Sequence, residues 1–251
     1  MISVKSPLFL RYFIELSYRG THYHGWQIQP DANSVQEELN KAMSTILQEE
    51  VSIVGAGRTD AGVHASQMFA HFDSQKELND HFVYKFNSIL PNDIVISSLV
   101  KVSDDAHARF DATSRSYEYK IWLGRSPFLL DTTWQIHQQE LDVDLMNEAA
   151  KVLLEYTDFE CFSKVKTDVR TFECTVTNAI WKQESQSLTF YISANRFLRN
   201  MVRAIVGTLI EVGQGKKSVD DFRKVIESKK RSEAGLSVPA QGLFLTEVKY
   251  S

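Results

Sequence analysis

The residues from Gly55 to Ala65 combine groups that could do chemistry with a backbone that could hold them. The segment reads Gly-Ala-Gly-Arg-Thr-Asp-Ala-Gly-Val-His-Ala and follows a short β-branched stretch that favours a strand. Its three glycines permit positive φ angles and close approach of a ligand to the backbone. Asp60 is a candidate nucleophile, and Arg58 and His64 stand close to it in the sequence.

Three interpretations of this segment compete. It begins like a dinucleotide-binding fingerprint, but Asp60 stands where the third glycine belongs, and a carboxylate there would repel a pyrophosphate. An Asp-x-Gly sequence by itself is typical of a tight turn. An active-site loop is the third interpretation, and it is favoured because a turn needs neither Arg58 nor His64.

The segment 196–212 predicts a helix with an apolar face and a stripe of arginines. Arg196, Arg199 and Arg203 recur at spacings of three and four, which would place them together beside the apolar face. Such a stripe fits a solvated edge and a surface that binds phosphate or a buried carboxylate equally well. The apolar positions, which indicate a buried face, are Leu198, Met201, Val202, Ile205, Val206, Leu209 and Ile210.

Two arginines are interleaved with aromatic residues farther along the chain. Arg109 lies in the run His-Ala-Arg-Phe that starts at His107, and Arg115 precedes Tyr117 and Tyr119 at strand spacing. This interleaving suits RNA, because bases stack on aromatic rings and phosphates pair with arginine. It also fits half-buried strand residues, which are the more common outcome for alternating aromatics.

The elements that must position these residues mix helices and strands without strict alternation. The mixture predicts an α+β protein with helices packed on a mainly antiparallel sheet. The two halves have similar content, which suggests an N-terminal subdomain, 1–111, with the Asp60 loop and a C-terminal subdomain, 112–251, with the Arg203 helix. Expected strands are 13–18, 51–54, 68–72, 94–102, 116–123, 171–182, 188–194 and 242–250. Expected helices are one after a capping box at Ser34, then 77–88, 142–156, 196–212 and 219–228.

Composition and charge narrow the class of protein. With 251 residues, 43% hydrophobic and 24% charged, the chain has the make-up of a globular protein. It has neither an apolar run of membrane-spanning length nor an N-terminal signal sequence, so we expect a cytoplasmic protein that does not associate with a membrane. The net charge of −4 argues against a general nucleic-acid binder but permits a local basic cleft. Cys161 and Cys174 are expected to be reduced thiols, although the sequence also permits a disulfide between them.

Taken together, these segments resemble the tRNA pseudouridine synthase A family over nearly the whole chain and in the right order. Residues 56–64 match the family signature A-G-R-T-D-A-G-V-H without a mismatch. Five further motifs of the family occur in the same order: Y-x-G-W-Q-x-Q at 23–29, S-V-Q-E at 34–37, H-A-R-F at 107–110, R-x-Y-x-Y at 115–119 and F-x-x-x-M-V-R at 197–203. The probability that all of these matches arise by chance is negligible.

The resemblance implies an isomerase that converts uridine to pseudouridine in the anticodon stem-loop of tRNA, around positions 38, 39 and 40. It implies that Asp60 is the nucleophile, that Arg203 pairs with it, and that Tyr117 contacts the flipped uridine. Family members are homodimers with a basic cleft and use no metal and no organic cofactor. One departure is Arg19, which stands where the family usually has Asp, and it concerns RNA contact rather than chemistry.

The resemblance also implies a fold and further RNA contacts. Each chain is expected to hold two ferredoxin-like (RRM-like) subdomains that form a continuous, mainly antiparallel sheet flanked by helices, with the active-site cleft between them. Two other classes stay open: an RNA-binding module without catalysis, which would not need Asp60, and a nucleotide-dependent oxidoreductase, which would bind NAD. Besides Tyr117, the candidate substrate-binding residues are Arg58, Thr59, His64, Arg109 and Arg199.

Overall fold

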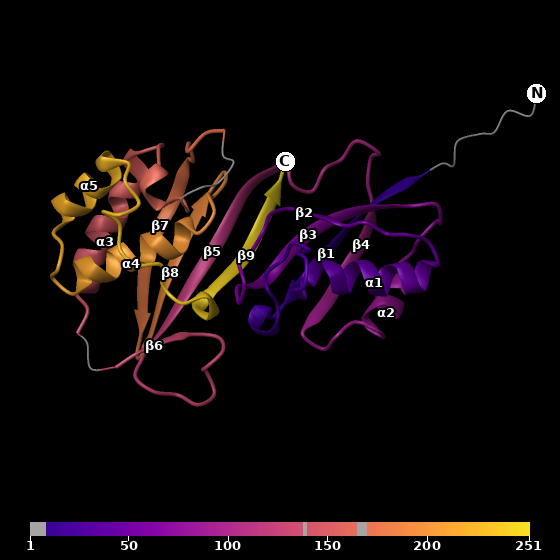
Figure 1. Cartoon of the computed structure of the whole chain (residues 1–251), viewed down its shortest axis with the longest axis horizontal. Helices are drawn as coiled ribbons and strands as arrows, with labels where there is room; N and C mark the ends of the chain where they lie inside the picture. The colour runs from indigo at the N-terminus through magenta and orange to yellow at the C-terminus, as the bar shows by residue number, and fades with distance from the viewer. Residues whose placement is uncertain (1–8, 138–139, 165–169) are drawn as a thin grey trace, which may run out of the picture. The chain divides into compact units, whose positions relative to one another are not determined.

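The computed structural model describes residues 9–137, 140–164 and 170–251 (Figure 1). The expectation about a signal sequence concerns the first residues of the chain, which lie outside these ranges. Contacts along the chain divide it into two compact units. The first unit runs to Ala112 and includes the last two residues of the chain, and the second runs from Thr113 to Lys249.

Tyr250 is the last residue of a strand whose other residues belong to the second unit, but Tyr250 itself belongs to the first unit. Its ring packs edge-on against Phe13 and Phe69, at centroid distances of 5.5 and 5.3 Å. Its hydroxyl donates a hydrogen bond to the carbonyl of Ala108 at 2.7 Å. The end of the chain therefore contributes to the packing of the first unit.

Three antiparallel strands form the sheet of the first unit in the order β4, β1, β3. β1 (Leu10–Tyr18) lies between β3 (His64–Ser74) and β4 (Ile94–Lys101), and alternate residues along most of β1 are buried. A short strand, β2 (Val54–Gly55), pairs with β3. The strands expected near 13–18, 68–72 and 94–102 are confirmed.

The strand expected just before the glycine-rich segment is wrong in its extent, because only its last residue joins β2. The backbone N–H group of Val51 donates to Ser44 Oγ at 2.9 Å, and that of Ile53 donates to Asn40 Oδ1 at 3.0 Å. Both acceptors lie on α1 (Val35–Leu47). These residues are therefore tied to the helix through their backbone, and not to the sheet.

Two α-helices complete the part of the first unit that the structure describes. α1 begins as the sequence predicts, since the Ser34 side chain accepts a hydrogen bond from the N–H group of Glu37. α2 (His81–Asn87) begins later than expected. The buried Leu78 explains the delay, because its N–H group donates to the hydroxyl of Tyr12 at 2.9 Å and so holds the preceding segment outside the helix.

The described residues of the second unit form five strands. The sheet order is β9 (Leu243–Tyr250), β5 (Ala112–Leu123), β8 (Ser187–Ala194) and β7 (Val176–Glu184). β8 pairs antiparallel with both β5 and β7, and the short β6 (Trp134–Ile136) pairs parallel with β5. The expected strands are confirmed, but β7 starts later than predicted because the residues before it bond to the segment after α3.

Three helices of the second unit gather beside β7 and β8: α3 (Val143–Val152), α4 (Met201–Gly213) and α5 (Val219–Ser228) (Figure 1). α5 has the predicted bounds and starts with a capping box in which Ser218 and Asp221 each bond to the other's backbone. α3 is shorter than predicted, because its last expected turn continues as a 3-10 helix.

The helix predicted at 196–212 is wrong at its start. Asn200, which precedes α4, has a φ of 67°, and this left-handed conformation cannot continue a right-handed helix. Arg196 and Arg199 therefore lie in the loop before α4. They do not form a helical stripe with Arg203, so that expectation is corrected.

The fold class is confirmed as α+β, with mainly antiparallel strands flanked by helices. Cys161 and Cys174 are buried free thiols, which confirms the expectation of reduced cysteines. Burial raises the pKa of Cys161 to about 12 and that of Cys174 to about 11. Within the described ranges, no helix has both the length and the apolar character needed to cross a membrane.

Candidate active site

Asp60 lies at the start of a tight turn in the loop of residues 55–65, the Asp60 loop. Its backbone carbonyl accepts a hydrogen bond from the N–H group of Val63 at 3.1 Å. Gly62 has a φ of 78°, a conformation that favours glycine. The side chain of Asp60 is half-buried. The turn and the active-site interpretation are therefore compatible, since the turn fixes where the carboxylate lies.

The segment between β1 and α1 holds the Asp60 loop in place. The N–H group of Trp26 donates to the carbonyl of Thr59 at 3.2 Å, and that of Gly62 donates to the carbonyl of Tyr23 at 3.2 Å. The hydroxyl groups of Tyr18 and Thr59 are hydrogen-bonded at 2.8 Å. Thr59 is thus buried and engaged on both its backbone and its side chain, which supports a positioning role for this residue.

Two glycines allow the backbones of these segments to touch. A Cβ atom on Gly20 would lie 1.9 Å from the carbonyl oxygen of Val63. A Cβ atom on Gly25, which has a φ of 97°, would lie 2.4 Å from the carbonyl oxygen of Thr59. A larger residue at either position would displace the Asp60 loop. Sequence reasoning missed this contact, and the glycine within the motif at 23–29 is the one signal that points to it.

His64 is the first residue of β3 and lies buried at the end of the Asp60 loop. Only 1% of its surface is exposed, and its Nδ1 atom accepts a hydrogen bond from the N–H group of Gly20 at 3.0 Å. An accepting Nδ1 means that the neutral ring carries its proton on Nε2. The burial supports a positioning role rather than the expected contact with substrate. Arg58, in contrast, is exposed.

The segment that holds the Asp60 loop is itself tied to the residue before β4. The hydroxyl of Tyr23 donates to Asp93 Oδ1 at 2.6 Å, and the backbone N–H group of Arg19 donates to the Asp93 carbonyl at 2.9 Å. Burial, together with the bond to Asp93, raises the pKa of Tyr23. The backbone role of Arg19 does not depend on its side chain, so this departure from the family pattern leaves the scaffold intact.

The His-Ala-Arg-Phe run forms a compact turn in the first unit. The Nδ1 atom of His107 accepts hydrogen bonds from the N–H groups of Arg109 and Phe110, at 3.1 and 3.2 Å. The ring of Phe110 is 75% exposed, and the guanidinium of Arg109 lies 5.8 Å from its centre. An exposed arginine beside an exposed aromatic ring is the arrangement that the sequence predicts for contact with RNA.

His71 supports this turn from below. Its Nδ1 atom accepts a hydrogen bond from the N–H group of Ala108 at 3.1 Å, and its ring packs edge-on against His107 at 4.5 Å. Burial is the main cause that lowers the pKa of His71 to about 4, and the charges of His107 and Arg11 lower it further. His71 is therefore neutral at pH 7.

Tyr117 and Arg115 project from β5 in the second unit, where two of the sequence motifs meet. The half-exposed ring of Tyr117 contacts Phe197 edge-on, with a centroid distance of 5.1 Å and an interplanar angle of 87°. The Nη1 atom of Arg115 donates to the carbonyl of Asn195 at 2.9 Å. β5 is thereby connected to the segment that precedes α4.

Arg203 lies in the first turn of α4 and is half-buried. Its Nε atom donates to the carbonyl of Val238 at 2.7 Å, and its own carbonyl accepts from the N–H group of Val238. The hydroxyl of Tyr119 donates to the carbonyl of Pro239 at 2.7 Å. Burial raises the pKa of Tyr119, and the charge of Arg203 acts against that rise. The hydrogen bond to Val238 holds the guanidinium of Arg203 in place.

The structure brings some of the predicted residues together. Arg58, Thr59, Asp60 and His64 share one loop of the first unit, and Tyr117 and Arg203 belong to the second unit. The pairing of Asp60 with Arg203 stays a prediction. Arg199 is exposed, and its carbonyl accepts a hydrogen bond from the N–H group of Lys164. Among the described residues, no group of three or more His, Cys, Asp or Glu is placed to hold a metal ion.

Comparison with known proteins places the chain in a family. Residues 16–111 and 149–251 match the family described as tRNA pseudouridine synthase. The chain is similar to a Bacteroides fragilis protein named tRNA pseudouridine synthase A, with 54% identity over 243 residues, 96% of each chain. It is similar to a Clostridium perfringens protein named tRNA pseudouridine synthase A 2, with 39% identity over 239 residues, 94% of this chain and 98% of that protein. The resemblance and the expected enzyme class, an isomerase, are thus confirmed, and the chain belongs to the tRNA pseudouridine synthase family.

Proposed function

We propose that this protein isomerises uridine to pseudouridine in the anticodon stem-loop of tRNA, around positions 38, 39 and 40, with Asp60 as the nucleophile. The observation that carries the proposal is a nine-residue family signature folded into a turn that is fixed from two sides. Hydrogen bonds and glycine contacts hold the backbone around Asp60. Relatives that carry the name tRNA pseudouridine synthase A over nearly the whole chain support the substrate class.

The reaction is an isomerisation that needs a charged nucleophile. The bond between N1 of uracil and C1′ of ribose breaks, and a bond between C5 and C1′ forms. C5 loses one proton and N1 gains one, so the step consumes no water and needs no redox partner. The carboxylate of Asp60 attacks either the base or C1′, and it must be ionised in both cases. A neighbouring arginine favours the charged form.

Arg203 is the residue that we assign to this electrostatic role. The hydrogen bond from its Nε atom to the carbonyl of Val238 sets the plane of the guanidinium. A guanidinium fixed in advance pairs with a carboxylate in a defined direction, which a flexible ammonium group would not do. The side chain is half-buried, so solvent screens its charge less than at an exposed site.

The target base must leave its stack before Asp60 can reach it. Extrusion costs a few kcal/mol, which contacts in the active site and along the backbone offset. We assign Tyr117 to hold the extruded uracil, because Phe197 supports its ring edge-on while part of the ring stays exposed. The exposed Arg58 occupies the space left in the RNA or braces Asp60.

Arginines at the surface of both units supply contacts to the RNA backbone. Arg109 with its neighbour Phe110 offers a cation and a stacking ring in the first unit, and Arg199 is exposed in the second. We expect a homodimer, whose two chains assemble a basic groove although each chain carries a net charge of −4. Light scattering after gel filtration measures the mass, and twice 28.7 kDa is the expected value. We expect the protein to act in the cytoplasm.

Pseudouridine mapping tests the proposed function. Transcripts of tRNA are incubated with wild-type protein, with Asp60→Asn and with Asp80→Asn, then labelled with carbodiimide and read by primer extension. Asp80 is an exposed aspartate of the same unit whose side chain makes no cap bond to α2, so its variant is the matched control. Wild type and the control should give stops around positions 38 to 40, and Asp60→Asn should give none.

The variant must keep its fold and its affinity for tRNA, because the proposal assigns Asp60 to the chemical step. Circular dichroism and a tRNA-binding assay measure both properties. If Asp60→Asn loses its fold or its affinity, Asp60 is structural. If the wild-type protein binds tRNA without modifying it, the protein is an RNA-binding relative without catalysis.

A further inference from the structure

The segment that follows α4 carries a local excess of positive charge. Residues 216–231 contain seven of the chain's 28 Lys and Arg and three of its 32 Asp and Glu. Their net charge is therefore +4, in a chain whose net charge is −4. The segment includes the loop after α4, the whole of α5 and the first residues beyond it. None of its residues belongs to the motifs that point to Asp60 and Arg203.

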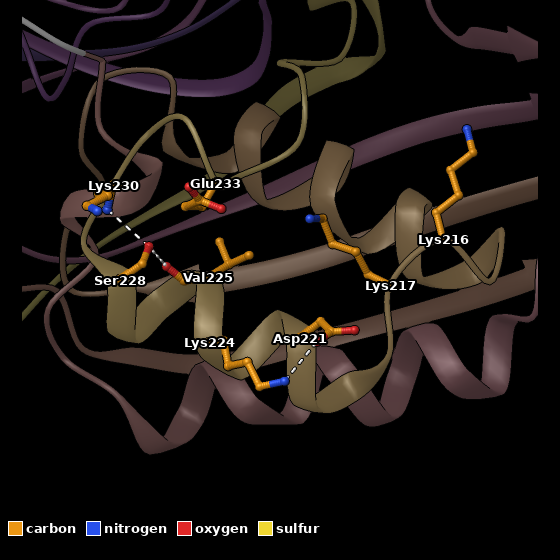
Figure 2. A pocket seen from close by; sticks show the side chains of 8 residues that line it. All are labelled: Lys216, Lys217, Asp221, Lys224, Val225, Ser228, Lys230 and Glu233. Carbon is orange, nitrogen blue, oxygen red and sulfur yellow. Dashed lines mark hydrogen bonds and ion pairs between the residues drawn. The ribbon is translucent and has the colours of Figure 1, made fainter.

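Several of these charges surround one hollow of about 380 Å³, which we call the lysine hollow. Lys217 reaches toward it from the loop after α4, Lys224 lies on α5, and Lys230 lies on the opposite side (Figure 2). The residues that line the hollow are Lys216, Lys217, Lys224, Lys230, Asp221, Glu233, Val225 and Ser228.

Asp221, the acidic residue of α5 that lines the hollow, already bonds to neighbouring groups. The carboxylate of Asp221 accepts hydrogen bonds from the backbone N–H and the hydroxyl of Ser218, at 3.1 and 2.8 Å, and pairs with Lys224 at 3.0 Å. The bond from the Ser218 backbone is the main cause that lowers the pKa of Asp221 to about 2. Within the described residues, neither Lys216 nor Lys230 forms an ion pair.

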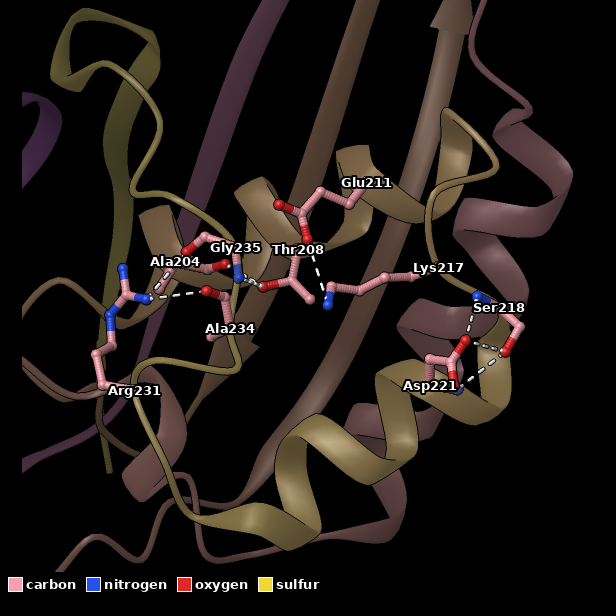
Figure 3. A network of polar contacts seen from close by, with 9 residues as sticks. All are labelled: Ala204, Thr208, Glu211, Lys217, Ser218, Asp221, Arg231, Ala234 and Gly235. Atoms are coloured by element: carbon pink, nitrogen blue, oxygen red, sulfur yellow. Dashed lines mark hydrogen bonds and ion pairs between the residues drawn. The ribbon is translucent and has the colours of Figure 1, made fainter.

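Polar contacts join α4 to the segment that follows Lys230 and to Lys217 (Figure 3). The N–H group of Gly235 donates to the buried hydroxyl of Thr208 at 2.9 Å, and the guanidinium of Arg231 donates to the carbonyl of Gly235 at 3.0 Å. On the other side, Lys217 lies 3.7 Å from the carboxylate of Glu211. The loop before α5 and the segment that follows Lys230 are therefore both held against α4.

The lining favours an anion that is held by charge alone. Among the described residues that line the hollow, none is aromatic and only Val225 is apolar, so the hollow offers no surface on which a base could stack. Lysine is a hydrated point charge without the planar fork that arginine offers. A phosphodiester backbone meets these conditions, because proteins recognise it through charge and without reading the bases.

We propose that the lysine hollow binds the phosphodiester backbone of the substrate tRNA at a point away from the target uridine. The proposal rests on the proposed function, because it takes tRNA as the substrate. Arg203 lies in the first turn of α4, whereas Lys216 and Lys217 of the hollow follow the last turn. At 1.5 Å per residue, the helix places these two lysines roughly 15 Å from Arg203. We therefore place the contact in a part of the tRNA that an isolated anticodon stem-loop lacks.

Salt-dependent binding to two RNA substrates tests the proposal. Fluorescence anisotropy measures the affinity of wild type and of Lys216→Gln/Lys230→Gln for full-length tRNA and for an anticodon stem-loop RNA, over a series of KCl concentrations. For tRNA, the variant should bind about tenfold more weakly at low salt, and the slope of log K against log salt should fall by about 2. For the stem-loop, wild type and variant should agree. The turnover rate at saturating tRNA should be unchanged.

A second double variant separates a local contact from a change in net charge. Lys41→Gln/Lys151→Gln removes two exposed lysines from α1 and α3, so the chain loses the same charge elsewhere. This control should keep the slope of the wild type. An equal fall in the control, or an unchanged slope in Lys216→Gln/Lys230→Gln, would overturn the proposal.

Three further outcomes separate the proposed contact from the proposed function. An equal loss of affinity for the stem-loop would overturn the placement of the contact away from the target uridine. A wild-type protein that binds tRNA but makes no pseudouridine would refute the proposed function alone, because the slopes would still decide whether the hollow binds the backbone. A wild-type protein that binds no tRNA would overturn both.

Discussion

The Asp60 loop and the lysine hollow achieve their geometry in opposite ways. The Asp60 loop is positioned by backbone atoms of two segments that touch through glycines and buried hydrogen bonds. The lysine hollow is lined by long lysine side chains, which have flexible stems, beside a segment that is hydrogen-bonded to α4. A group that must meet one reacting atom needs the first arrangement. A surface that meets a repeated charge along a polymer works with the second.

The contrast predicts that adding one methyl group near the Asp60 loop has the largest effect. Gly25→Ala places a Cβ 2.4 Å from the carbonyl oxygen of Thr59 at a φ of 97°, so the free energy of unfolding should fall by about 3 kcal/mol or more. Gly57→Ala is the matched control, since nothing lies within 4 Å of its Cβ. Urea denaturation measures both variants, and equal stability in the two would mean that the contact does not hold the loop.

Arg203 combines features of both regions. Its side chain is long and charged, like the lysines of the hollow, but a hydrogen bond fixes it, as hydrogen bonds fix the Asp60 loop. Arg203→Lys keeps the charge but loses the hydrogen bond from Nε to the carbonyl of Val238. We expect kcat/KM to fall about 100-fold, which corresponds to about 2.7 kcal/mol. Stability should change less, and thermal unfolding checks it. A variant with wild-type kcat/KM would remove Arg203 from the mechanism.

The buried His71 of the first unit should make the stability of the protein depend on pH. The pKa of His71 is about 4 in the folded protein and about 6.5 in an unfolded chain. Below pH 6.5 the unfolded chain therefore binds more protons, and stability is lost as the pH falls from about 6.5 toward 4. Between pH 7 and 4.5 the wild type should lose about 2 kcal/mol more than His71→Asn, whose amide oxygen could still accept from Ala108. Urea midpoints at the two pH values measure this, and parallel losses would contradict it.

The smallest effect is expected at the lysine hollow. Lys216→Gln and Lys230→Gln remove exposed charges that take part in no ion pair among the described residues. The free energy of unfolding should change by less than about 0.5 kcal/mol for each substitution. A fall above 1.5 kcal/mol in urea denaturation would show that these lysines support the fold, and would break the contrast with the Asp60 loop.

Sequence reasoning worked best where a local signal determines the structure. Ser218 caps α5, whose bounds were predicted as observed, and Gly62 marks the turn that positions Asp60. It failed where one residue adopts an uncommon conformation, as at Asn200, since helical periodicity continues through that position and masks the break. It also failed for Val51, whose N–H group bonds to a side chain of α1. The contact between Gly25 and Thr59 joins residues far apart in the sequence, which periodicity does not report.

The aromatic contacts of Tyr250 have a consequence for the order of events on the ribosome. Phe13 and Phe69 are synthesised early, but the ring that packs against them and the hydroxyl that bonds to Ala108 are made only after the whole of the second unit. Domains usually fold in the order in which they are made, with the N-terminal one first. The first unit of this protein cannot complete its packing in that order, because Tyr250 follows the second unit in the sequence. Its final step of folding therefore comes after the synthesis of the second unit.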